Sequence, residues 1–247
     1  TGSLDTTGAT LLIAACSYGG TPTGVTDSKG NTWVGLTART NTGVSTRIFY
    51  VNSATPTVGT GHTFTLAGTG IAGAINVLAF SGNTAAPFVE ENGTSAASGS
   101  TIAPGAVVPT EDGYLVVTGF TGGNTFGGAG TIGASFNITD QKALTGGVNY
   151  GTAAAYLIQS TAASVNPTWT LGSTVSNISS AIATFRVAGA AGFKKATVNA
   201  SDVPATQTNF PSYVDLSRLG ITTLAEAQSV RVYADSAKTT EWAREIV

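Results

Sequence analysis

The chain has 247 residues, of which 42% are hydrophobic and only 10% are charged, and its formal net charge is −2. An ordinary soluble domain has roughly 25% charged residues, so this surface must consist largely of hydroxyls, small side chains and backbone. The near-neutral charge and the lack of a basic run argue against a nucleic-acid partner. No apolar stretch reaches the roughly 18 residues of a membrane-spanning helix, and the opening Thr1–Asp5 has no basic signal-peptide region.

The sequence contains an internal duplication, which predicts two homologous halves at residues 9–82 and 113–187. Leu66 and Leu171 are separated by 105 positions (171 − 66), and so are Phe80 and Phe185 (185 − 80). The corresponding runs are 10–14 with 114–118, 25–27 with 138–140, 48–51 with 155–158, 63–66 with 168–171, and 74–80 with 180–185. We expect the two copies to fold against each other as one sandwich.

The first copy reads as short strands separated by turns. Residues 11–17 are almost continuously apolar, which predicts a buried central strand. Asp27–Asn31 has turn composition, in which Gly30 can take a positive φ and Asp27 can accept hydrogen bonds from nearby backbone N–H groups. We expect Trp33 to face the core. Further strands are predicted at 46–52, 62–66 and 74–80, the last of them central in its sheet.

The second copy follows a Gly/Ala/Ser-rich connector at residues 83–106. Strands are predicted at 114–120, 136–139, 152–158, 168–171 and 178–187, with a long, mobile glycine-rich loop at 122–133. Residues 1–188 therefore indicate an all-β fold: a two-sheet, jelly-roll-like β-sandwich of about ten strands.

Composition changes after Val187. Residues 189–192 are expected to be a flexible linker, and 193–247 a small α+β segment that is incomplete in this chain or completed by a partner. Thr223–Glu226 matches a capping box, so a short helix is expected there.

No set of residues predicts catalysis, a metal or a cofactor. His62 is the only histidine and follows Gly61 at a strand start, which favours a surface or edge position over a catalytic triad. No Gly-x-Ser-x-Gly motif is present, and one histidine with one cysteine cannot close a zinc site. The single Cys16 excludes an intrachain disulfide and is expected to be buried.

Several acidic and aromatic residues have a functional and a structural interpretation. Asp27, Lys29 and Asn31 alternate as in a calcium loop, but Lys29 stands where an oxygen ligand is needed, so a turn is favoured. The adjacent pairs Glu90–Glu91 and Glu111–Asp112 point to opposite faces of a strand, unlike the converging acids of glycosidases. Trp33 and Trp169 could be sugar-stacking platforms, but Trp169 stands at the repeat position of Phe64, which favours a shared core role. Trp242 is interpreted as an interface residue.

Two parts of the chain resemble known families. Phe193–Val198, Asn209–Leu216 and Glu241–Val247 resemble a β-rich domain of unknown function that recurs in bacterial surface proteins and tailed-phage structural proteins. Asp27–Trp33 and Phe80–Gly82 look like repeat-built sandwich domains of phage virion proteins. Neither resemblance supplies catalytic residues to carry over.

These resemblances imply a non-enzymatic structural protein on the surface of a bacteriophage particle: a capsid decoration, fibre or tail-associated subunit. Its partners would be other virion proteins or copies of itself, with host surface glycans as a further partner class. The alternative is a carbohydrate-binding or adhesin module of a bacterial surface protein, with its site in the loops at 19–24 or 122–133. A depolymerase is a third hypothesis.

Overall fold

The computed structural model describes residues 1–53, 55–123, 130–144 and 150–187. The chain divides into two compact units, Thr1–Gly192 and Phe193–Val247. The expected linker at 189–192, the expected α+β segment and Trp242 lie outside the described residues. The described part is all-β, so no helix that could span a membrane occurs in it.

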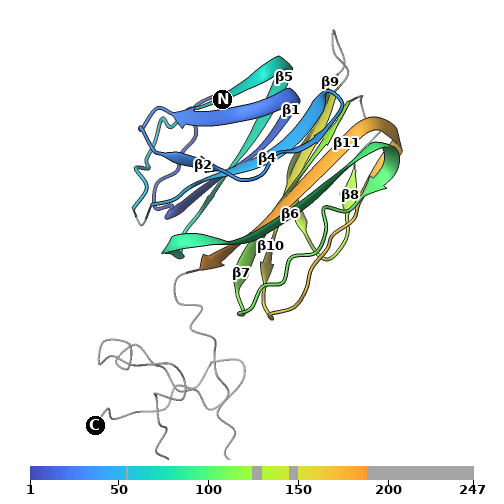
Figure 1. The fold of residues 1–247 in the computed structure, drawn as a ribbon. Helices are drawn as coiled ribbons and strands as arrows, with labels where there is room; N and C mark the ends of the chain where they lie inside the picture. Colours follow the sequence, from blue (N-terminus) through green and yellow to red (C-terminus); the bar gives the residue numbers. More distant parts are fainter. Residues whose placement is uncertain (54, 124–129, 145–149, 188–247) are drawn as a thin grey trace, which may run out of the picture. The chain divides into compact units, whose positions relative to one another are not determined.

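The described residues form eleven strands in two sheets that pack face to face, which confirms the predicted β-sandwich (Figure 1). The strands of the first sheet are β1 (Leu11–Asp27), β2 (Trp33–Gly35), β3 (Arg39–Asn41), β4 (Val44–Val51) and β5 (Phe64–Phe80). Those of the second sheet are β6 (Asn83–Ile102), β7 (Tyr114–Gly122), β8 (Thr131–Ile132), β9 (Asn137–Leu144), β10 (Tyr150–Gln159) and β11 (Trp169–Val187).

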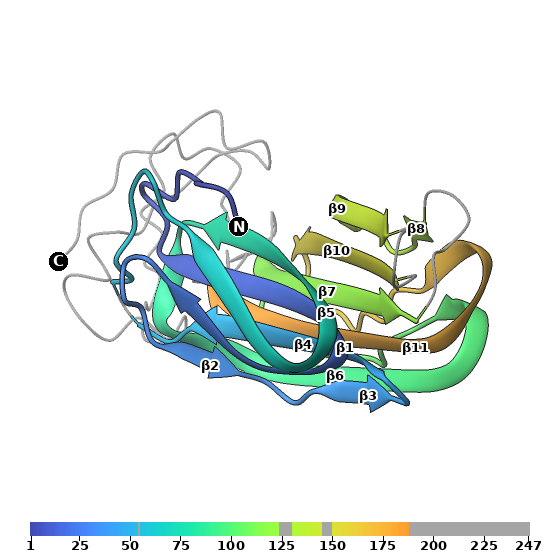
Figure 2. The ribbon, with the colours of Figure 1, turned by 90° about the horizontal axis from the view of Figure 1, so that it is seen from above.

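Each repeat forms one sheet. The first sheet has the order β2-β4-β1-β5, and the second has the order β6-β11-β7-β10-β9. If β1 is matched with β7, β4 with β10, β5 with β11 and β2 with β9, the two orders are the same, with β6 as an added strand beside β11. Figure 2 shows β9 and β10 at one side of the sandwich and β6 and β3 at the other. The two repeats are thus related by a pseudo-two-fold axis that runs between the sheets.

Hydroxyl side chains follow the same pseudo-symmetry. The Oγ1 of Thr46 on β4 is 2.7 Å from that of Thr121 on β7. The matching pair joins Thr152 on β10 to Ser17 on β1, again at 2.7 Å. All four side chains are buried. A buried hydroxyl without a partner is costly, so these reciprocal bonds fix how the two sheets sit on each other.

Apolar residues fill the space between the sheets and also cover the outer face of each sheet. The central cluster joins Leu11, Ile13 and Ile48 of the first sheet to Leu115, Val117 and Phe185 of the second. Each sheet also has an apolar cluster on its outer face, the face away from the other sheet. The long strands β5 and β11 bend, so that their first residues, Phe64 and Trp169, pack in these outer clusters. Phe64 and Trp169 are 1% and 0% exposed, which confirms their shared core role.

Strand β1 confirms the predicted central strand, since residues 11–17 lie between β4 and β5 and are buried. The predicted turn is also confirmed: Gly30 has φ of 76°, and Asp27 accepts a bond from the Lys29 N–H at 2.8 Å. Trp33 is half-buried against the outer clusters of the first sheet.

Three expectations about strands are wrong. Residues 83–106 are not a connector, because 83–102 form β6, which pairs with the edge of β11. Residues 74–80 are not central, because β5 ends its sheet and pairs only with β1 among the described strands. The predicted strands at 62–66 and 74–80 are not separate, because residues 64–66 and 74–80 both belong to β5. Strand β11 likewise joins residues 169–171 to 178–187. Register shifts in both pairings let one strand bend without breaking.

Two smaller corrections concern the repeat. Val25–Asp27 and Ile138–Asp140 are not equivalent, since the former ends β1 and the latter lies in β9. The loop expected at 122–133 contains β8 at Thr131–Ile132, which pairs with β11. Its residues 124–129 lie outside the described part of the chain.

Candidate functional site

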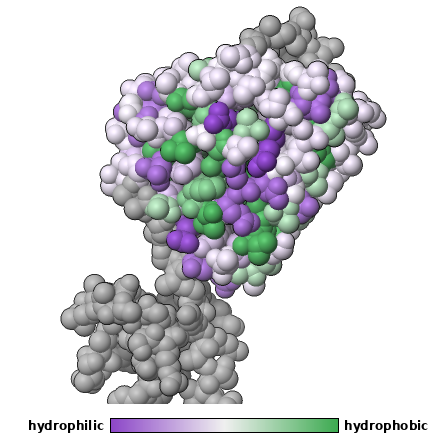
Figure 3. Space-filling view, viewed as in Figure 1, coloured by the Kyte–Doolittle hydropathy of each residue, from purple (hydrophilic) through white to green (hydrophobic). Residues whose placement is uncertain are grey.

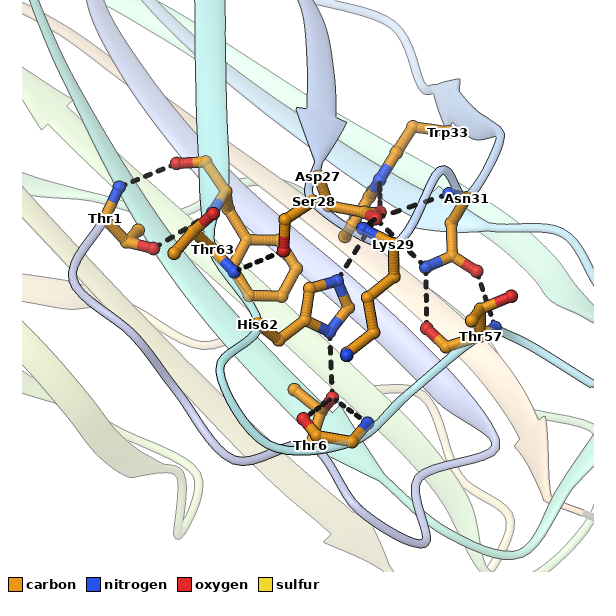
Figure 4. A network of polar contacts seen from close by, with 12 residues as sticks. Thr1, Thr6, Asp27, Ser28, Lys29, Asn31, Trp33, Thr57, His62 and Thr63 are labelled. Carbon is orange, nitrogen blue, oxygen red and sulfur yellow. Dashed lines mark hydrogen bonds and ion pairs between the residues drawn. The ribbon is translucent and has the colours of Figure 1, made fainter.

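A polar network of the first sheet is centred on the carboxylate of Asp27, at the end of β1 (Figure 4). Its Oδ1 accepts a hydrogen bond from the backbone N–H of Lys29 at 2.8 Å, and its Oδ2 accepts one from the indole Nε1 of Trp33 at 2.7 Å. The backbone N–H and the side-chain amide of Asn31 each donate to Oδ1 at 3.3 Å. The turn that follows β1 is therefore wrapped around one carboxylate.

His62 connects this carboxylate to the segment that precedes β1. Its Nε2 lies 3.1 Å from Asp27 Oδ1, and neither side chain has exposed surface. Its Nδ1 lies 2.8 Å from the Oγ1 of Thr6. The imidazole packs on Phe64 with ring centroids 4.2 Å apart. The expectation of a surface or edge position for His62 is wrong, because its partners come from residues 6 and 27, distant in sequence.

The Asp27 carboxyl is ionised in this setting. Burial alone raises the pKa of Asp27, but the hydrogen bonds from Trp33, His62 and the Lys29 backbone outweigh burial and lower the pKa below its ordinary value of 3.8. The two carboxylate oxygens accept hydrogen bonds from Lys29, Asn31 and Trp33, and Nε2 of His62 lies 3.1 Å from Oδ1. No group of three or more metal-ligating residues occurs in the described ranges.

Thr6, His62 and Asp27 together form a hydroxyl–imidazole–carboxylate series like that of a hydrolytic triad. A nucleophile must reach a substrate, yet Thr6 is only 3% exposed. Its Oγ1 is also 3.1 Å from the Gly59 N–H and 3.2 Å from the Gly59 carbonyl oxygen. The series therefore has the geometry of a clamp, which ties residues 4–6 and 59–62 to the turn after β1.

The acidic pairs weighed in the sequence have separate partners. Glu91 accepts hydrogen bonds from the backbone and hydroxyl of Thr37 at 2.9 and 2.7 Å and lies 3.9 Å from Arg39. Glu90 bonds instead to the backbone N–H of Val108, which confirms that the adjacent carboxylates point apart. Asp112 accepts from the backbone N–H of Ala162 at 2.6 Å. Each of these three carboxylates thus holds a nearby chain segment.

Two further expectations concern Cys16 and the loops. Cys16 is 0% exposed, and burial raises the pKa of its thiol far above the ordinary range, so its interpretation as a small core residue is confirmed. The loop expected at residues 19–24, one of the two candidate glycan sites, is wrong because these residues belong to β1.

Comparison with family models, with curated proteins and with solved structures gives no match for this chain. The two family resemblances noted from the sequence therefore stay hypotheses.

Proposed function

We propose that this chain is a non-enzymatic structural protein of a bacteriophage particle, exposed on the virion surface as a decoration, fibre or tail-associated subunit. The observation that carries the proposal is the way the two repeats are joined. Buried hydroxyl pairs, Thr46 with Thr121 and Ser17 with Thr152, bond the sheets to each other at 2.7 Å within one apolar core. Such a body is suited to bearing load and presenting a surface rather than to opening around a substrate.

The composition of the surface supports the same role. On the face shown in Figure 3, most of the described surface has intermediate hydropathy, with strongly hydrophilic residues scattered among small apolar areas. This agrees with the 10% content of charged residues. Weak charge reduces the repulsion between copies packed at high density, as subunits of a particle are.

The polar network at Asp27 also supports a structural role. The side chains of Thr6, Asp27 and His62 are buried, and each contacts other protein groups, as expected of a network that holds loops in place. The virion assignment itself draws on the two resemblances seen in the sequence.

Mass spectrometry of purified particles and immunogold labelling of intact particles test the proposal together. We expect the chain in a fixed stoichiometric ratio to the major capsid protein, with gold on the particle exterior. Particles of full infectivity that lack the chain, or a chain found only in soluble lysate, would contradict it. Release of reducing ends from host polysaccharide would instead support the depolymerase hypothesis.

A further inference from the structure

The two sheets have four edges among the described residues. The first sheet ends in β5 on one side and in the short strands β2 and β3 on the other, and the second sheet ends in β6 and in β9. An edge strand presents a row of N–H and C=O groups that pairs readily with a strand of another chain. Each edge therefore needs either protection or a partner.

Three of these edges do not favour pairing with the sheet of a second chain. Strands β2 and β3 have only three residues each. Strand β6 contains Pro87 and two adjacent glutamates, of which Glu90 bonds to the backbone N–H of Val108, and proline and like charges both protect an edge. Strand β5 is uncharged, but it lies over β10, with Phe80 against Tyr156, so β9 extends past it and keeps another sheet away.

Strand β9 is the edge that a second sheet can reach. Its eight residues, Asn137–Leu144, form the last strand of the second sheet, beside β10 (Figure 2). No described strand pairs with its other side. Asn137, Asp140 and Lys142 are exposed, as expected of a strand that extends past the first sheet.

The two charged residues of β9 lie on the same face of the strand. Lys142 is opposite Thr152 of β10, and Asp140 is opposite Ala154. Thr152 points toward the first sheet, because its hydroxyl lies 2.7 Å from that of Ser17 on β1. Residues paired across a sheet share a face, so Asp140 and Lys142 are both on the face toward the first sheet, and they carry opposite charges two positions apart.

This arrangement of charges is complementary to itself. If two copies of β9 pair antiparallel about a two-fold axis at Gln141, Asp140 of each copy lies opposite Lys142 of the other, and opposite charges attract in both places. A shift of two residues is the smallest that keeps the same side chains on the same face. Such a shift would place Asp140 opposite Asp140 or Lys142 opposite Lys142. The charges of β9 therefore favour one register of self-pairing.

We propose that the protein forms a two-fold symmetric dimer in which β9 pairs antiparallel with β9 of a second copy, with Asp140 of each chain opposite Lys142 of the other. The second sheets of the two copies then form one continuous sheet. The β5 strands of the two copies flank a trough whose floor carries the two Asp140–Lys142 pairs. This inference does not depend on the protein belonging to a virion.

Sedimentation equilibrium of the full chain over a concentration series tests the dimer. Wild type should approach twice the chain mass of 24.6 kDa as its concentration rises. Asp140→Lys replaces both attractive pairs with repulsive ones, so the dissociation constant should rise at least about tenfold. Glu111→Lys makes the same change of charge at an exposed residue outside the strands. It is the matched control and should dimerise like wild type.

A charge exchange separates this interface from any other. The double variant Asp140→Lys/Lys142→Asp again has opposite charges facing each other in the same register, so it should recover the dimer that Asp140→Lys loses. A wild-type chain that stays monomeric at every concentration would overturn the proposal. An Asp140→Lys variant that dimerises like wild type, or a double variant as weak as the single one, would overturn it as well.

Disulfide trapping tests the register. In a Cys16→Ala background, which leaves no other thiol, Asp140→Cys and Lys142→Cys chains are oxidised separately and as a mixture. Residues directly opposite each other in antiparallel strands are close enough for a disulfide, whereas a residue and its own copy two positions away are not. Intact mass should therefore show linked dimers with one chain of each kind in the mixture and few linked dimers in the separate samples. Equal linking in all three samples, or none in the mixture, would overturn the proposal.

Discussion

The substitution Asp27→Asn tests whether the network around Asp27 is a clamp. The carboxylate accepts bonds from Trp33 and the Lys29 backbone and contacts His62 through its two oxygens. An amide keeps one oxygen but replaces the other with a donor, so either Trp33 or His62 faces an N–H group. Hydrogen bonds to a charged acceptor contribute about 1.5–3 kcal/mol, and a buried donor left unpaired costs about 1–3 kcal/mol. We expect the free energy of unfolding to fall by roughly 2–4 kcal/mol.

Urea titration followed by far-UV circular dichroism measures this change without relying on Trp33 fluorescence, which the substitution itself alters. The matched control is Asp5→Asn, because Asp5 also accepts a backbone N–H two residues on, from Thr7 at 2.9 Å, but in an exposed turn. The control should unfold at nearly the wild-type urea concentration. An Asp27→Asn protein within about 0.5 kcal/mol of wild type, the usual range of neutral surface changes, would refute the clamp.

Three further predictions follow from the fold. Because folding lowers the pKa of Asp27, the ionised carboxylate contributes to the free energy of unfolding above the ordinary pKa of 3.8, and this contribution is lost as the pH falls through the lower pKa of the folded state. The free energies of unfolding of wild type and Asp27→Asn should therefore converge when urea titrations are repeated in acid. A difference that stays constant with pH would contradict this. Thr46→Val should cost about 1–3 kcal/mol because it removes the buried hydrogen bonds that Thr46 makes with Thr121 and Ser179, whereas the exposed Thr23→Val should be neutral. Trp169→Ala should cost about 3–5 kcal/mol in the same titration, and a smaller loss than for Thr46→Val would argue against its place in the core.

The repeat and the central strands could be predicted because apolar residues that are close in sequence, or repeated at a fixed offset, indicate them. Residues 11–17 are apolar on both faces, as a strand with neighbours on both sides and cores above and below must be. Trp169 could be placed in the core because it shares a repeat position with Phe64. These features depend on residues that are close in sequence or repeated at a fixed offset.

The edge strands could not be predicted in the same way. β6 is rich in Gly, Ala and Ser and lacks strand propensity, since its place is decided by the free edge of β11. Residues 74–80 were predicted to be central because they are apolar on both faces apart from Asn76, yet β5 ends its sheet in the described part of the chain.

The polar clamp was also beyond prediction. His62 is close to glycines and threonines in sequence, and nothing there signals that Thr6 and Asp27 converge on its ring. Only the folding of β1 and β5 side by side brings the three segments together, with Asp27 opposite Phe64 in the pairing.

Equilibrium unfolding monitored from each sheet separately tests most directly whether the two repeats form one body. In a Trp242→Phe background, Trp33→Phe leaves Trp169 to report on the second sheet, and Trp169→Phe leaves Trp33 to report on the first. We predict that in each variant the fluorescence transition coincides with the far-UV circular dichroism transition, as for one cooperative unit. Fluorescence midpoints that separate from the circular dichroism curve would show two independently folding halves and contradict the account.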